Sequence, residues 1–189
     1  MPLGRRRLAC LALPALATAC SSPDPALYTI QMRQGPVLPS GPRVIQLRDI
    51  GLASYLDRRE IVRSAADYRL GVMSNDWWGE PLAAMLSRVI ILGLSQRLPN
   101  SKIYPEGGAI SVDPNAVLGV NIQRLDLDAA GSLVLEAQAA VEFNRPRRSA
   151  SMSYRIVKAP AVRSVAGQVA ASSDAVGELT DGLATLLQP

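Results

Sequence analysis

The side chains that most often perform chemistry in enzymes are scarce in this 189-residue sequence. It contains no histidine, and its two cysteines are Cys10 and Cys20. A histidine-containing triad, a histidine metal site and a cysteine cluster for zinc or iron–sulfur are therefore excluded for this chain alone. Neither a P-loop nor a G-x-G-x-x-G sequence is present. We expect no metal, no other cofactor and no enzymatic activity.

The carboxylates and hydroxyl groups do not change this expectation. Asp126 and Asp128 share one face at the end of a predicted strand, where we expect both carboxylates to be in contact with water. Ser172 and Ser173 have no neighbouring base that would activate a hydroxyl group. Together with Asp174 they are typical of the cap that begins a helix.

Cys20 has the clearest chemical role. Arginines at 5–7 precede an apolar stretch, 8–19, that is too short to cross the roughly 30 Å hydrocarbon core, which is typical of a secretory signal peptide. The sequence LATAC at 16–20 resembles the bacterial lipobox. This resemblance implies cleavage before Cys20, fatty acylation of Cys20 and, because Ser21 follows, sorting to the outer membrane of a Gram-negative bacterium. The alternative is a secreted protein with a spare cysteine.

The chain divides into three parts. Residues 1–19 form the expected signal peptide, residues 20–42 a proline-rich tether, and residues 43–189 a globular domain. Without the arginines at 5–7, the 20 basic residues fall to 17 against 16 acidic ones, a net charge of +1. With so little positive charge and only 4% aromatic residues, we expect no binding to nucleic acid.

Hydrophobic periodicity predicts several strands. Strict alternation over 133–143 indicates a strand with one face in water, and a change of alternation within 117–128 indicates a bulge near Gln123 and Arg124. Residues 130–132 are expected to form the turn between these two strands. Shorter strands are expected at 44–47, 60–64, 68–72, 102–104 and 152–157.

Two long helices are also predicted. Caps at 74–76 are expected to begin an amphipathic helix that continues to Leu94, and 98–100 ends it. The second helix is expected after the cap at 172–174. We therefore expect a single α+β domain: a mainly antiparallel sheet with two long helices packed on one face.

The two tryptophans of the chain are adjacent. At consecutive helix positions their side chains would point about 100° apart, so both cannot face the same core. Trp78 is in phase with Leu82 and Met85, which predicts that it is buried. Trp77 has two interpretations: it packs under a loop, or it is partly exposed and contacts a partner or lipid.

The order of these elements resembles the paraquat-inducible protein C family, which comprises auxiliary lipoproteins of ABC-type lipid transporters with MCE (mammalian cell entry) domains. The resemblance rests on the lipobox, Tyr28-Thr29-Ile30, Tyr55-Leu56-Asp57-Arg58 before Ile61-Val62, and Trp78-Gly79-Glu80-Pro81-Leu82 at the start of the long helix. Two positions differ from the family pattern: Ser54 replaces a usual proline, and Trp77 replaces a usual basic residue.

The resemblance implies a periplasm-facing lipoprotein that assists phospholipid movement between membranes. Its implied partners are an MCE-domain protein, an inner-membrane permease and an ATPase, and a ring-shaped conduit would be matched by a symmetric homo-oligomer. The alternative is an envelope-assembly or scaffold lipoprotein with no role in lipid movement. The residues expected to contact the partner are Tyr55, Leu56, Asp57, Arg58, Trp77 and Trp78.

Overall fold

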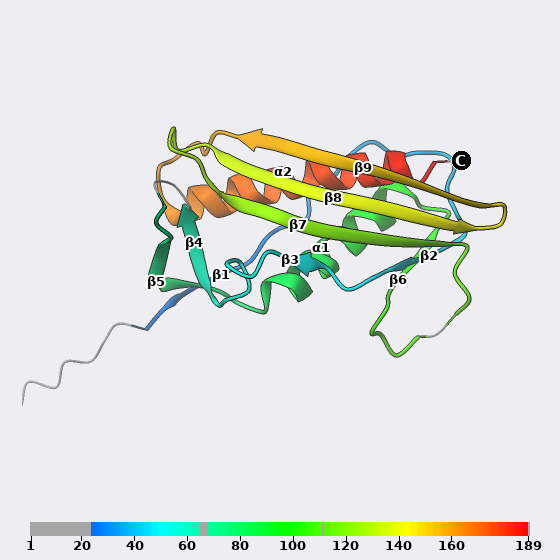
Figure 1. The fold of residues 1–189 in the computed structure, drawn as a ribbon, viewed down its shortest axis with the longest axis horizontal. Helices are drawn as coiled ribbons and strands as arrows, with labels where there is room; N and C mark the ends of the chain where they lie inside the picture. Colours follow the sequence, from blue (N-terminus) through cyan, green and yellow to red (C-terminus); the bar gives the residue numbers. More distant parts are fainter. Residues whose placement is uncertain (1–23, 65–67, 111, 189) are drawn as a thin grey trace, which may run out of the picture.

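A nine-stranded mixed sheet and two helices form the two layers of the protein (Figure 1). The structure is a computed structural model that describes residues 24–64, 68–110 and 112–188. The expected signal peptide, Cys20 and Ser21 lie outside these residues. The strands are β1 (Ala26–Tyr28), β2 (Val44–Leu47), β3 (Gly51–Leu52), β4 (Glu60–Ser64), β5 (Gly71–Trp78), β6 (Lys102–Pro105), β7 (Ala116–Leu127), β8 (Leu133–Asn144) and β9 (Arg147–Lys158). The helices are α1 (Leu82–Arg97) and α2 (Val165–Leu186).

The long strands β7, β8 and β9 form an antiparallel meander, as the sequence predicts. Buried and exposed residues alternate along β8 from Ala137 to Asn144, because one face covers the helices and the other faces water. The register of β7 against β8 shifts between Ile122 and Arg124, which confirms the bulge. Gly131 has φ of 83° in the turn between the two strands, a conformation that favours glycine.

The other edge of β7 pairs in turn with three short strands. β2 pairs with its first residues, β3 with its middle and β4 with Leu127 at its end, all in parallel orientation. The sheet is therefore mixed and not purely antiparallel, whereas the predicted α+β class is confirmed. Parallel pairing joins strands that are distant in sequence, so it leaves no mark in local periodicity. This arrangement places β2 and β6 at one end of the molecule and β1, β4 and β5 at the other (Figure 1).

Both helices begin at a different residue from the one predicted. Residues 74–76 belong to β5 and do not cap α1, since pairing with β4 and β1 keeps the backbone extended as far as Trp78. α1 begins after Pro81, and its buried residues follow the predicted three- and four-residue spacing.

The cap of α2 is Ser164, whose hydroxyl oxygen accepts a hydrogen bond from the Gly167 backbone N–H. Ser172 and Ser173 are buried in the middle of the helix and donate to the carbonyl groups of Gln168 and Val169. The prediction of a cap at 172–174 is therefore wrong. Eight positions before Ser172, the Ser164 hydroxyl already accepts from a free N–H group, so the helix begins there.

The segment predicted as a tether is part of the body from Tyr28 onward. Ile30 is buried, the Leu38 N–H donates to the Arg97 carbonyl at 2.7 Å, and the backbone of Gly35 bonds to the side chain of Gln96. Gly177 allows this close packing, because a Cβ there would lie 2.7 Å from Cβ of Arg33. The prolines prevent regular pairing with the sheet but do not prevent packing on the helices.

Arg97 joins these layers from inside the protein. Its side chain is 1% exposed and donates to Asp181, which is at the surface, and to the carbonyl groups of Gly93, Gly177 and Arg33. A buried guanidinium is tolerated only where its donors are satisfied in this way. Arg97 therefore ties α1, α2 and the 28–42 segment together.

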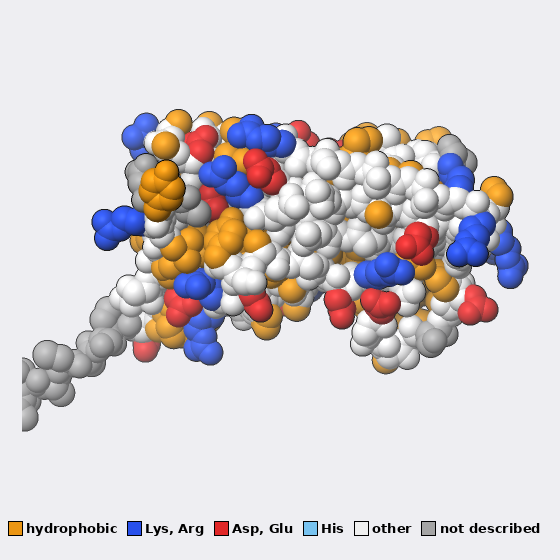
Figure 2. Space-filling model, in the orientation of Figure 1, with side chains coloured by type: hydrophobic (Ala, Val, Ile, Leu, Met, Phe, Trp, Pro, Cys, Tyr) orange, Lys and Arg blue, Asp and Glu red, His pale blue; other side chains and the backbone are white. Residues whose placement is uncertain are grey.

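The surface differs along the length of the molecule (Figure 2). The broad outer face of the meander carries few hydrophobic or charged side chains in this view. At the left end, over β4 and β5, hydrophobic side chains gather among Lys and Arg side chains. No helix of the described residues is both long and apolar enough to cross a bilayer.

Candidate functional site

The residues predicted to contact a partner come from two segments that β-pairing brings together. Trp77 lies opposite Glu60 of β4, and the Trp78 N–H donates to the Arg59 carbonyl at 2.7 Å. The chain from Asp57 to Arg59 therefore runs beside the last residues of β5. This contact arises because the hairpin of β4 and β5 closes with a register shift between Glu60 and Ile61.

These segments enclose an open pocket of about 420 Å³. We call it the tryptophan pocket; it is lined by Asp57, Arg58, Arg59, Trp77, Trp78, Glu80, Pro81 and Leu82. Four of the six residues predicted to contact a partner line it, and Tyr55 and Leu56 do not.

Trp77 and Trp78 lie on opposite faces of the sheet, because they are neighbours on a strand and not on a helix. Trp78 is 8% exposed and belongs to the core, as predicted. Trp77 is half-buried, and the Arg59 guanidinium lies 5.0 Å from the centre of its ring, a cation–π contact. Its indole N–H donates to the Ser74 carbonyl at 2.8 Å, which fixes the orientation of the ring.

The pocket also contains a donor without a partner. Among the described residues, no acceptor lies within hydrogen-bond distance of the buried Arg58 Nε. Arg59 is exposed next to it, and Glu80 is engaged by Arg88 of α1. An unpaired buried donor costs free energy. Because this atom is buried, an acceptor that enters the pocket meets the exposed guanidinium of Arg59. The pocket is suited to an oxygen-rich group, such as a carboxylate or a main-chain carbonyl, beside an apolar surface.

Tyr55 and Leu56 hold the loop in place. Leu56 is 2% exposed, and the Tyr55 hydroxyl donates to Asp126 Oδ2 at 2.7 Å. Burial, and next the hydrogen bond to Asp126, raise the pKa of Tyr55. The Ala53 N–H donates to the Ile122 carbonyl, so the loop lies across β7.

Asp126 is fully buried, so the expectation that it contacts water is wrong. Its carboxylate accepts from Tyr55 and, at 3.0 Å, from Arg124 Nε. Tyr55 precedes Asp126 by 71 residues, so the pattern around Asp126 did not contain the residue that covers it. Asp128 is half-buried and accepts from the N–H groups of Ala130 and Ser132 in the turn.

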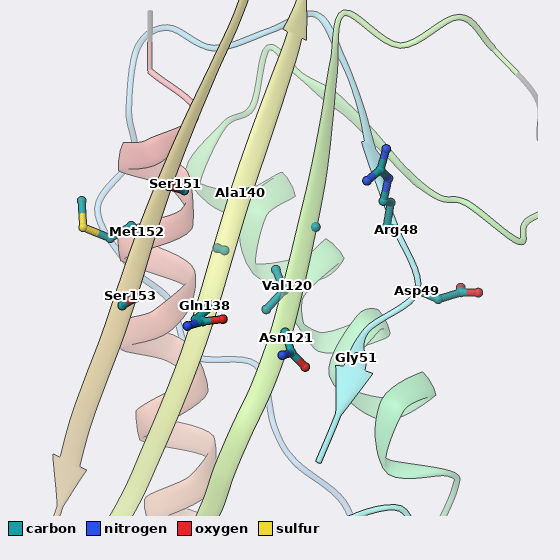
Figure 3. Close-up of a pocket in the computed structure, with 12 residues that line it drawn as sticks. Arg48, Asp49, Gly51, Val120, Asn121, Gln138, Ala140, Ser151, Met152 and Ser153 are labelled. Carbon is teal, nitrogen blue, oxygen red and sulfur yellow. The ribbon is translucent and has the colours of Figure 1, made fainter. Parts of the chain in front are cut away.

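Two larger hollows lie elsewhere. The one in Figure 3 has a volume of about 650 Å³ and lies over the meander, where Asn121 of β7 and Gln138 of β8 line it together with Arg48 and Asp49 on the chain after β2. The other, of about 710 Å³, follows α1 past Ala84, Ile91 and Leu92 and is mostly apolar. Within residues 24–64, 68–110 and 112–188, no group of His, Cys, Asp or Glu side chains is arranged to hold a metal ion.

Two solved structures resemble this fold. An uncharacterized protein has a TM-score of 0.71 at 14% sequence identity, over 86% of this chain and 98% of its own. Protein XCC0632 from Xanthomonas campestris, assigned to DUF330, has a TM-score of 0.70 at 19% identity, over 85% of this chain and 94% of its own. These likenesses show the fold alone. No curated protein matches the sequence.

The family is shown by the sequence itself. A family model described as "ABC-type transport auxiliary lipoprotein component" matches residues 28–184. The match begins at Tyr28, where the chain joins the body, and ends near the end of α2. It includes both segments of the tryptophan pocket. The chain belongs to the family of ABC-type transport auxiliary lipoprotein components.

Proposed function

We propose that this protein is a non-catalytic lipoprotein, acylated at Cys20 and anchored in the outer membrane, that docks an MCE-domain lipid conduit in the periplasm. The permease and ATPase of the same system lie in the inner membrane. The family membership supports the transport role, and the lipobox at 16–20 supports the anchor. The docking site is the tryptophan pocket.

The physical need for such an adaptor follows from the cost of exposing lipid to water. Each exposed CH₂ costs about 0.8 kcal/mol, so a phospholipid crosses the periplasm only inside an apolar conduit. The end of that conduit must be held at the receiving membrane. A protein tethered to the membrane by acyl chains raises its local concentration there and holds the conduit at low cost.

The observation that carries the docking proposal is the cation–π pair of exposed Arg59 and half-buried Trp77 in the lining of the tryptophan pocket. Arginine and tryptophan are the side chains most enriched at the energetic centres of protein interfaces. Tyr55, Leu56 and Ser74 already fix the geometry, so binding orders few additional groups. The partner segment is an apolar loop that carries a carboxylate or exposed carbonyl groups.

The test is co-purification from cells that express the whole transport system. We expect Arg59→Ala combined with Trp77→Ala to reduce the recovered MCE-domain protein at least tenfold. The matched control is Arg155→Ala combined with Met152→Ala, which removes an exposed arginine and an exposed apolar residue from β9. Equal recovery in both variants would place the interface elsewhere. Recovery of outer-membrane assembly proteins without any MCE-domain protein would favour the scaffold alternative.

A further inference from the structure

The length of chain between Cys20 and the body limits how far the protein stands from the membrane. The first described residue is Asp24, and an extended chain spans at most about 3.6 Å per residue, so Asp24 lies within about 14 Å of Cys20. If Cys20 is acylated, as the proposed function requires, β1 starts next to the bilayer. The face of the molecule around β1 then becomes the face nearest the lipid.

That face is the end of the molecule at the left of Figure 1. β1, the hairpin of β4 and β5, and the connection from β9 to α2 meet there. We call it the anchor end and define it by half-buried Arg63 and by the exposed side chains of Leu27, Tyr68, Arg69, Leu70, Val162 and Arg163.

Four of these side chains are large and hydrophobic but point into water. Leu27 is 67% exposed, Val162 is 63% exposed, Tyr68 is fully exposed and Leu70 is 39% exposed. They come from three separate parts of the sequence, so their common position is a property of the fold. Exposed tyrosine and leucine side chains that lie at one end of a protein are typical of proteins that contact the headgroup region of a bilayer.

The remaining three residues of the anchor end are basic. Arg63 and Arg163 line one shallow hollow together with Val162, and Arg69 stands between Tyr68 and Leu70 in sequence. Within the described part of the chain, none of the three arginines forms an ion pair. The nearby Asp128 is already engaged by two backbone N–H groups of its own turn. Among the described residues, the anchor end therefore presents three arginines without an ion pair, next to apolar side chains.

We infer that the anchor end rests on the phospholipid surface. Leu27, Tyr68, Leu70 and Val162 reach the boundary between headgroups and acyl chains, and the three arginines bind lipid phosphates. Arginine is suited to both environments because its stem is apolar and its guanidinium remains hydrated. The contact turns a flexible attachment through Cys20 into a fixed orientation, with the long axis of the molecule pointing away from the membrane.

The opposite end supplies a matched control. Ile110 is 57% exposed and Val112 is 47% exposed, on the loop between β6 and β7. They resemble Leu27 and Leu70 in size and exposure, and the tethered protein holds them far from the bilayer. A contact caused by hydrophobicity alone would involve both ends equally.

The test is photo-crosslinking in vesicles of phosphatidylethanolamine and phosphatidylglycerol carrying the full mature lipoprotein. We expect Leu27→p-benzoylphenylalanine and Tyr68→p-benzoylphenylalanine to yield phospholipid adducts, detected by mass spectrometry, at least tenfold more than Ile110→p-benzoylphenylalanine. Arg69→Gln combined with Arg163→Gln should lower the adduct at residue 68 several-fold without releasing the protein. Equal adducts at residues 27, 68 and 110 in bound protein would overturn the inference, as would adducts only to protein.

A second arm separates this inference from the anchoring itself. If Cys20 proves unmodified in the native protein, its thiol is coupled to a maleimide-headgroup phospholipid and the three positions are compared again. Preferential adducts at residues 27 and 68 then support the membrane face even though the proposed acylation has failed. Acylated protein without preferential adducts refutes the membrane face and leaves the anchor intact.

Discussion

The meander of β7, β8 and β9 and the anchor end are built by different kinds of contact. In the meander, consecutive strands of twelve residues pair with each other. Every second side chain along each strand points to the same face of the sheet. At the anchor end, shorter strands from distant parts of the chain meet. Their inward side chains, such as Ile61, are buried, whereas Leu27 and Leu70 remain exposed. The comparison indicates that the meander contributes most to stability. The surfaces available for binding lie at the anchor end, where long strand pairing stops.

The largest expected effect on stability concerns the adjacent tryptophans, one in the core and one at the surface. Trp78→Ala should lower the free energy of unfolding by about 3–5 kcal/mol, because it removes a core side chain. Trp77→Ala should lower it by about 1 kcal/mol or less, since its side chain is at the surface. Urea denaturation followed by circular dichroism measures both. Similar losses for the two variants would show that Trp77 is also structural.

Arg97 provides the next test, because it holds the 28–42 segment against the two helices. Arg97→Ala should cost about 3 kcal/mol, because Asp181 and three carbonyl groups lose their donor. Arg88 lies in the same helix as Arg97 and forms a surface ion pair with Glu80, which precedes the helix. Arg88→Ala should cost about 0.5 kcal/mol of the free energy of unfolding. Hydrogen exchange should show faster exchange of the Leu38 N–H only in the Arg97 variant. Unchanged exchange at Leu38 would mean that the segment packs independently of Arg97.

Tyr55 joins the loop at 53–59 to β7 of the meander, and the effect of removing its hydroxyl group should depend on pH. Tyr55→Phe should cost about 1–3 kcal/mol at neutral pH, since buried Asp126 loses a donor. The pKa of Tyr55 is raised in the folded protein, so the unfolded chain loses this proton first. The contribution of Tyr55 is therefore fully present below about pH 10 and decreases as the pH rises above it. Denaturation midpoints should converge for the two proteins above pH 10; a constant difference would contradict this assignment.

The smallest expected effect is on stability at the anchor end. Leu27→Ser and its control Ile110→Ser should each change the free energy of unfolding by no more than about 0.5 kcal/mol, because both side chains are exposed. A loss above about 1.5 kcal/mol for Leu27→Ser would show that this leucine packs against the body and is not available for lipid.

The parts of the fold that were predicted correctly depend on neighbours in sequence. The strand over 133–143, the bulge near Gln123 and the turn at Gly131 each follow from the alternation or backbone freedom of a few consecutive residues. The long helix after Pro81 was also recognised from its spacing, although its first residue was placed four positions too early.

The parts that were missed depend on contacts far along the chain. Residues 74–76 have the composition of a helix cap, but pairing with β1 and β4 keeps them extended. Asp126 has the composition of a solvated strand end, but Tyr55 covers it. The prolines between 28 and 42 indicated a tether, but Arg97 and Gln96 bind that segment to α1. Trp77 was indicated by its position next to Trp78, whereas Asp57 and Arg58 were indicated only by the family resemblance; all three line the tryptophan pocket.

The equal length of β7, β8 and β9 has a consequence for the reach of the protein. Twelve residues at about 3.3 Å each give a stiff rod of about 40 Å, which ends at the turn around Pro146. Because side chains alternate, this rod can be lengthened or shortened only in steps of two residues, and only in all three strands together. Relatives that reach farther from the membrane, or less far, should therefore differ here by matched pairs of residues, each pair adding or removing about 7 Å.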